Sequence, residues 1–137
     1  MSDGLDQLLI ATVLGLLPSA PPITVCPDGF VPNGTLRPYV LVYSSVGRPP
    51  DVPSNAADGL SRTLTARFIA HCAGETAASA RAVAAYVHTF WLDVRPVVAG
   101  LTCGLIRQES YQDPVRDEST GTLVMDSICT YTLTATT

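Results

Sequence analysis

Two histidines and four cysteines are the side chains of this sequence best suited to nucleophilic chemistry. His71 is followed directly by Cys72, but neighbouring residues of a strand point to opposite faces, so these two side chains cannot form a catalytic pair. His88 and Cys103 are separated in the sequence and would meet only through the fold. We therefore expect no catalytic residue among them.

The cysteines and acidic residues do not have the spacing of a metal site. No C-x-x-C pair is present, which argues against zinc, and we expect all four cysteines to be reduced. The acids between Glu109 and Glu118 lack the regular spacing of an EF-hand loop. The chain also has no phosphate-binding glycine loop, no G-x-S-x-G and no H-E-x-x-H motif. We expect neither a metal nor a cofactor.

The charged residues near the C-terminal end of the chain form an acidic segment from Glu109 to Gly121. This segment separates two predicted strands, so a hairpin loop could project its charges together. Two roles remain open for the loop: lining a lumen, or docking to a neighbour. Its candidate residues are Glu109, Asp113, Arg116, Asp117 and Glu118.

The stretch from Thr63 to Trp91 is the unit around which the rest of the chain must be arranged. Apolar and polar residues alternate from Thr63 to Cys72, which predicts a half-buried strand. Thr76 is a plausible N-cap, and an apolar stripe at helical spacing follows it. We expect Phe68 on the strand and Trp91 at the helix end to be core residues. The predicted stripe consists of Ala80, Val83, Ala84, Val87 and Trp91.

The remaining predicted elements are a first helix that ends near Leu17 and strands over Tyr39 to Tyr43, Val97 to Arg107 and Leu123 to Thr134. A signal peptide is the alternative for the first segment, but it lacks a positively charged start. The expected apolar face of this helix is Leu5, Leu8, Leu9, Val13 and Leu16. The sequence therefore predicts one α+β domain over residues 1–137, with about four largely antiparallel strands and two helices on one face.

A long loop predicted from Val46 to Gly59 is the candidate contact between subunits. It contains Arg48, Pro49, Pro50 and Asp51 and follows neither structural period. Compact domains rarely keep such loops without a use for them.

Composition restricts the partners of the chain. The net charge is −4 and all eight basic residues are arginine. Sequence-independent binding of nucleic acid depends on cations that contact phosphates, so this charge argues against it. The first apolar run is too short to span a bilayer, so we expect no membrane contact.

The arrangement of these elements resembles the tail terminator proteins of long-tailed bacteriophages, especially phages of actinobacteria. The resemblance covers roughly residues 1 to 135 in element order. Its motifs are the strand Leu64 to Cys72 passing into Ala73-Gly74-Glu75-Thr76, the alanine-rich helix to Trp91, the segment Arg95-Pro96-Val97-Val98-Ala99-Gly100, and the closing strand Asp126-Ser127-Ile128-Cys129-Thr130-Tyr131-Thr132-Leu133.

The resemblance implies a structural virion protein, made in the host cytoplasm, that forms a homo-hexameric ring. Such a ring caps the tail tube, joins it to the head-side connector or stopper protein, and lets DNA pass without binding it specifically. The family offers no catalytic residues. Two alternatives remain open: a head-closure or stopper protein of the neck, and a small cytosolic enzyme or ligand-binding domain.

Overall fold

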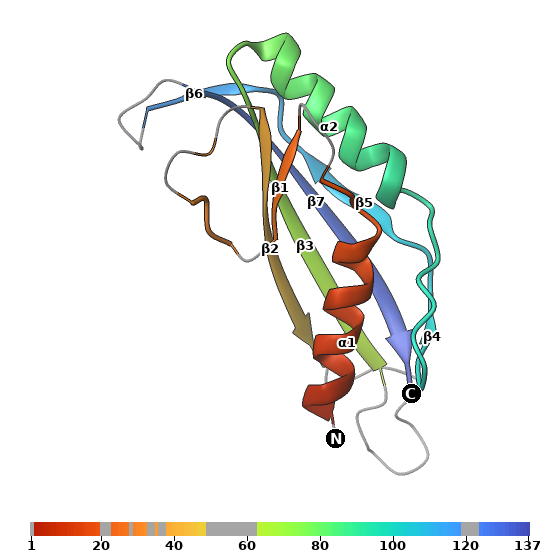
Figure 1. The fold of residues 1–137 in the computed structure, drawn as a ribbon. Coiled ribbons are helices and arrows are strands. Elements are labelled where there is room, and N and C mark those ends of the chain that lie inside the picture. Colours follow the sequence, from red (N-terminus) through yellow and green to blue (C-terminus); the bar gives the residue numbers. More distant parts are fainter. Residues whose placement is uncertain are drawn as a thin grey trace.

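The computed structural model describes residues 2–19, 23–27, 29–32, 35, 38–48, 63–118 and 124–137. Within these residues, two helices and seven strands form one sheet with helices packed on it (Figure 1). In chain order they are α1 (Ser2–Gly15), β1 (Thr24–Cys26), β2 (Tyr39–Gly47), β3 (Thr63–Gly74), α2 (Ala77–Trp91), β4 (Thr102–Cys103), β5 (Arg107–Tyr111), β6 (Val115–Asp117) and β7 (Val124–Thr136).

The long strand β7 is the centre of the sheet, whose order is β1-β2-β3-β7 with β4, β5 and β6 beyond β7. β3 pairs with β7 along nearly its whole length, from Gly74 opposite Met125 to Thr63 opposite Thr136. The three short strands therefore share the other edge of β7, each over its own stretch. Pairing is antiparallel except between β1 and β2, so the predicted α+β class with a largely antiparallel sheet is confirmed.

The number of strands was underestimated. About four were predicted, whereas the described residues contain seven. The predicted strand from Val97 to Arg107 is instead a tight turn, closed by the Leu101 N–H donating to the Val98 carbonyl at 3.1 Å, followed by β4 and a connection to β5. Gly100, with φ of +89°, supplies the left-handed conformation of that turn.

The strand-to-helix unit has the predicted pattern. On β3 the residues Leu64, Ala66, Phe68, Ala70 and Cys72 are 0–1% exposed. On α2 the buried residues are the predicted stripe, from Ala80 to Trp91. The side-chain oxygen of Thr76 accepts from the backbone N–H of Ser79 at 3.1 Å, which satisfies one of the free donors in the first turn of α2. Alternation therefore predicted which strand face and helix face are buried together.

Helix α1 buries part of its predicted face. The predicted residues Leu9 and Val13 are buried, as is Leu17 just after the helix, whereas Leu8 is 45% exposed. The indole N–H of Trp91 donates to the Val13 carbonyl at 3.0 Å and is buried. Apolar residues occupy several sides of this helix, so its own sequence left the buried face undetermined, and the contact with Trp91 helps to fix it.

Both helices pack on the same face of the sheet and share one core. Phe68 and Trp91 are 0% exposed, and their ring centroids lie 5.6 Å apart. Tyr131 of β7 meets Trp91 edge to face, with centroids 5.4 Å apart. Three aromatic rings from β3, α2 and β7 therefore join the two layers.

Candidate interaction surfaces

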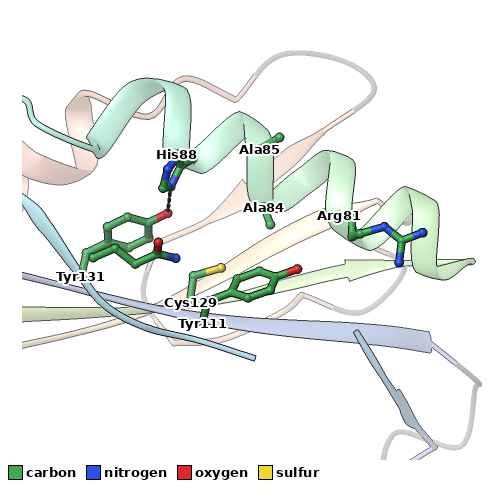
Figure 2. Close-up of a pocket in the computed structure, with 8 residues that line it drawn as sticks. Arg81, Ala84, Ala85, His88, Tyr111, Cys129 and Tyr131 are labelled. Carbon is green, nitrogen blue, oxygen red and sulfur yellow. Dashed lines mark hydrogen bonds between the residues drawn. The ribbon is translucent and has the colours of Figure 1, made fainter. Parts of the chain in front are cut away.

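A hollow of about 400 Å³ lies between α2 and the β5 side of the sheet, and we call it the α2/β5 groove. Figure 2 shows helix α2 on one side of it and side chains of β5 and β7 on the other. The groove is partly open to the surface. Its lining residues are Arg81, Ala84, Ala85, His88, Gln108, Tyr111, Cys129 and Tyr131.

The groove exists because α2 covers β3 and β7 but not β5. The register places Gln108 opposite Tyr131 and Tyr111 opposite Cys129, so these four residues point to the helix side of the sheet. Two of the four α2 residues that line the groove are alanines, whose short side chains leave space above β5. The result is a recess floored by Cys129 and Tyr131 and flanked by the exposed ring of Tyr111.

His88 is hydrogen-bonded to a residue on the floor of this groove. Its Nδ1 lies 3.0 Å from the hydroxyl of Tyr131, the bond drawn in Figure 2. Burial raises the pKa of Tyr131, so its hydroxyl stays protonated at neutral pH. This hydrogen bond orients His88 toward a phenol rather than toward a thiol.

The thiol nearest to His88 in the groove is engaged elsewhere. Cys129 forms a hydrogen-bonded pair with Cys72 of β3, and that bond and burial raise the pKa of Cys72. Cys129 is only 1% exposed. All four cysteines are buried free thiols. A nucleophilic cysteine needs a base within hydrogen-bond reach, and the described bonds give Cys129 none from histidine.

His71 lies on the opposite side of the sheet from Cys72, as the alternation predicted. This open face, the side of the sheet away from α1 and α2, carries Arg67 and His71 of β3 and Asp126 and Thr130 of β7. The Nδ1 of His71 is 3.2 Å from Oδ2 of Asp126, which is 8% exposed. Within the described residues the other oxygen of Asp126 has no hydrogen-bond partner.

The acidic residues do not form one loop, which corrects the prediction. Glu109 lies on β5, Arg116 and Asp117 lie on β6, and Asp113 is in the short connection between these strands. The polar segment was mistaken for a loop because edge strands need not be apolar; both strands gain their backbone hydrogen bonds from β7. The tip that follows Glu118, residues 119–123, lies outside the described residues.

Three of these charged residues, Glu109, Arg116 and Glu118, take part in ion pairs on the surface. Glu109 accepts two hydrogen bonds from Arg67, at 2.8 and 2.9 Å, and this partner lowers the pKa of Glu109. Arg116 lies 3.3 Å from Glu118. Asp113 is exposed, and no ion pair joins it to another described residue. The negative potential of the segment is therefore weaker than its residue types suggested.

Of the four candidate contact residues in the predicted loop, the structure describes only Arg48. Its guanidinium makes two hydrogen bonds to Asp6 of α1, at 2.6 and 3.0 Å. Pro49, Pro50 and Asp51 lie outside the described residues, and β2 continues to Gly47, so the predicted loop begins after that residue. Arg48 thus holds the end of β2 against α1.

Sequence reasoning missed Arg81, Gln108 and Tyr111. They come from two separated segments that meet only because β5 pairs with β7 and α2 crosses above it. The available signal was on the helix, where Arg81, Ala85 and His88 follow helical spacing beside the buried stripe.

No helix among the described residues is long and apolar enough to cross a membrane. The described residues also contain no cluster of three or more histidine, cysteine or acidic side chains that could hold a metal ion.

Comparison with solved structures finds the same fold in a chain of the virion of a native gene transfer agent (GTA) particle. The TM-score is 0.69 at 16% sequence identity, and the alignment covers 97% of this chain and 98% of that chain. No family model matches the sequence. No curated protein matches it either. The likeness extends over the whole fold, so both helices and the sheet take part in it.

Proposed function

We propose that this chain is a structural protein of a phage-like virion and acts as a tail terminator. The observation that carries the proposal is the fold similarity to a chain of the gene transfer agent virion, which spans nearly all of both chains. The sequence motifs from Leu64 to Gly100 and from Asp126 to Leu133 resemble the tail terminator family independently. An assembly role also suits the groove, because its histidine is bonded to the Tyr131 hydroxyl and not to a thiol that it could activate.

In this role the chain forms a hexameric ring that caps the tail tube and meets the head-side connector. It is therefore a virion protein of the neck and has no catalytic function. DNA passes through the ring without specific binding, since a chain of net charge −4 offers few cations to phosphates. The residues at the β5–β6 edge, Asp113 foremost, either face the lumen or dock to a neighbouring protein.

Two measurements test the proposal. The mass of the ring that the purified protein forms is expected to be six times that of the 14.4 kDa chain, with tail tubes added where the free protein does not assemble. Electron microscopy of particles that lack the protein is expected to show tube ends without a terminal ring, on tails that fail to join heads. Finished, ringed tails beside heads that lose their DNA would instead assign the chain to the stopper position.

Charge reversal tests the role of the β5–β6 edge. Asp113→Arg combined with Asp117→Arg and Glu118→Arg is expected to preserve the ring and to slow DNA ejection in a salt-dependent manner. Normal ejection from particles that contain the variant ring rejects the lumen position. Failure of tails to join heads assigns this edge to docking.

A further inference from the structure

We infer that the α2/β5 groove receives Phe30 from a second copy of this chain, so that neighbouring subunits of the ring join head to tail. The inference deepens the proposed function and rests on it. It names the contact that holds one subunit to the next.

Phe30 and the groove lie at opposite edges of the sheet. The groove belongs to β5, beyond β7, while Phe30 follows β1 at the β2 edge. After β1 the chain continues beside β2, where the backbone N–H of Gly29 donates to the Val42 carbonyl at 3.0 Å. A contact between two different edges is heterologous, and heterologous contacts close into rings when the rotation between subunits permits it.

The chain holds Phe30 in an exposed position. Its side chain is 65% exposed, although a large apolar side chain usually gains by burial. Gly29 before it has φ of +68°, and a Cβ at that residue would lie 2.9 Å from the ring of Tyr43. Only glycine fits this conformation and this close approach. Phe30 is therefore presented from a backbone anchored to β2.

The side chains around the groove can bind an aromatic ring. Arg81 forms no ion pair with another described residue, so its guanidinium is available to lie over an aromatic face. The ring of Tyr111 is 45% exposed and can meet a second ring edge to face. The short side chains of Ala84 and Ala85 leave the groove open for this ring. An aromatic anchor in a recess of this kind is a common centre of binding energy in protein interfaces.

The test removes each half of the contact separately. Phe30→Ala deletes the anchor, and Ala85→Trp fills the groove from an exposed position on α2. Each variant alone is expected to associate at least about 30-fold more weakly than the wild type. Leu8→Ala is the matched control, since it removes an exposed apolar side chain from α1, and it is expected to assemble normally. Thermal unfolding of each monomer establishes that the variants fold.

A mixture of the two variants distinguishes this geometry from any other. Phe30→Ala keeps an intact groove and Ala85→Trp keeps an intact anchor, so the mixture is expected to give one-to-one pairs that cannot extend into a ring. Native mass spectrometry counts the subunits. A photo-reactive benzoylphenylalanine at position 30 is expected to crosslink to α2 or β5 of a second copy.

The outcomes separate the inference from the function beneath it. Folded variants that each form normal rings, or crosslinks that avoid both α2 and β5, overturn the inference and leave the ring standing. A wild-type chain that stays monomeric even with tail tubes rejects the proposed function and the inference together.

Discussion

The junction between β3 and α2 depends on the absence of one carbon atom, and Gly74→Ala tests it. A Cβ on Gly74 would lie 2.6 Å from the backbone nitrogen of Ala80, and also 2.6 Å from the hydroxyl of Ser79. The hydroxyl can rotate away. The nitrogen cannot, because its N–H donates to the Thr76 carbonyl at 3.0 Å in the first turn of α2.

The loss of stability in Gly74→Ala can be worked out from how far the start of α2 must move. Ordinary contacts begin at 3.4 Å, so the start of α2 must move by about 0.8 Å from β3. Overpacking of this kind destabilises a protein by about 1–3 kcal/mol. The reduced entropy of the unfolded chain offsets about 0.4–1 kcal/mol of that. We expect a net loss of about 1–2 kcal/mol, which lowers the urea midpoint by roughly 1 M.

The control is Gly47→Ala at the end of β2, where an added Cβ meets nothing within 4 Å. Its stability is expected to be unchanged or slightly raised. Trp91, the only tryptophan of the chain, reports unfolding by fluorescence because it is buried at the far end of α2. Equal midpoints for the wild type and Gly74→Ala would refute the packing argument. A comparable loss in Gly47→Ala would show that the effect is not specific to the junction.

Three further predictions follow from the core, the surface and His71. Phe68→Ala is expected to lower the free energy of unfolding by about 3–5 kcal/mol in urea titrations, whereas Val97→Ala, at an 89% exposed residue, leaves it nearly unchanged. Glu109→Gln removes a carboxylate whose pKa is lowered in the folded state from its ordinary value of 4.5, so its contribution to stability is complete above that value and is lost as pH falls through the folded pKa. The urea midpoints of wild type and variant should therefore differ at pH 7 and converge only as pH falls below 4.5, and they should also converge in high salt. Replacing His71 by asparagine is expected to leave particle assembly intact with modest loss of stability, since His71 lies on the open face of the sheet, away from the groove; a folded variant that loses a measurable turnover would contradict the structural role.

Periodicity predicted the parts of this fold in which one face is buried and the other is not. β3 and α2 are such elements, and their buried residues were identified one by one. Helix α1 is apolar on several sides, so its buried face depends on Trp91, which is distant in the sequence. The strands β5 and β6 are polar and exposed, and they are strands because β7 pairs with them.

The interaction surfaces were less accessible to sequence reasoning than the core. Residue types predicted a negative patch at Glu109, but not that Arg67 would pair with this carboxylate. The groove combines a helix, an edge strand and a central strand, so no local pattern indicates it. Phe30 carried no signal, because an exposed phenylalanine cannot be told from a buried one by its neighbours in the sequence.

The position of β7 has a consequence for how cells make this protein. β7 pairs with β3, β4, β5 and β6, and the ribosome synthesises all four before it. Until β7 emerges, β3 has one unpaired edge, and Phe68 and Trp91 lack the ring of Tyr131. Unpaired edges and exposed apolar surface favour aggregation. Nascent chains arrested before residue 124 should therefore be captured by chaperones and cleaved by proteases, and protection should appear abruptly once β7 clears the ribosome.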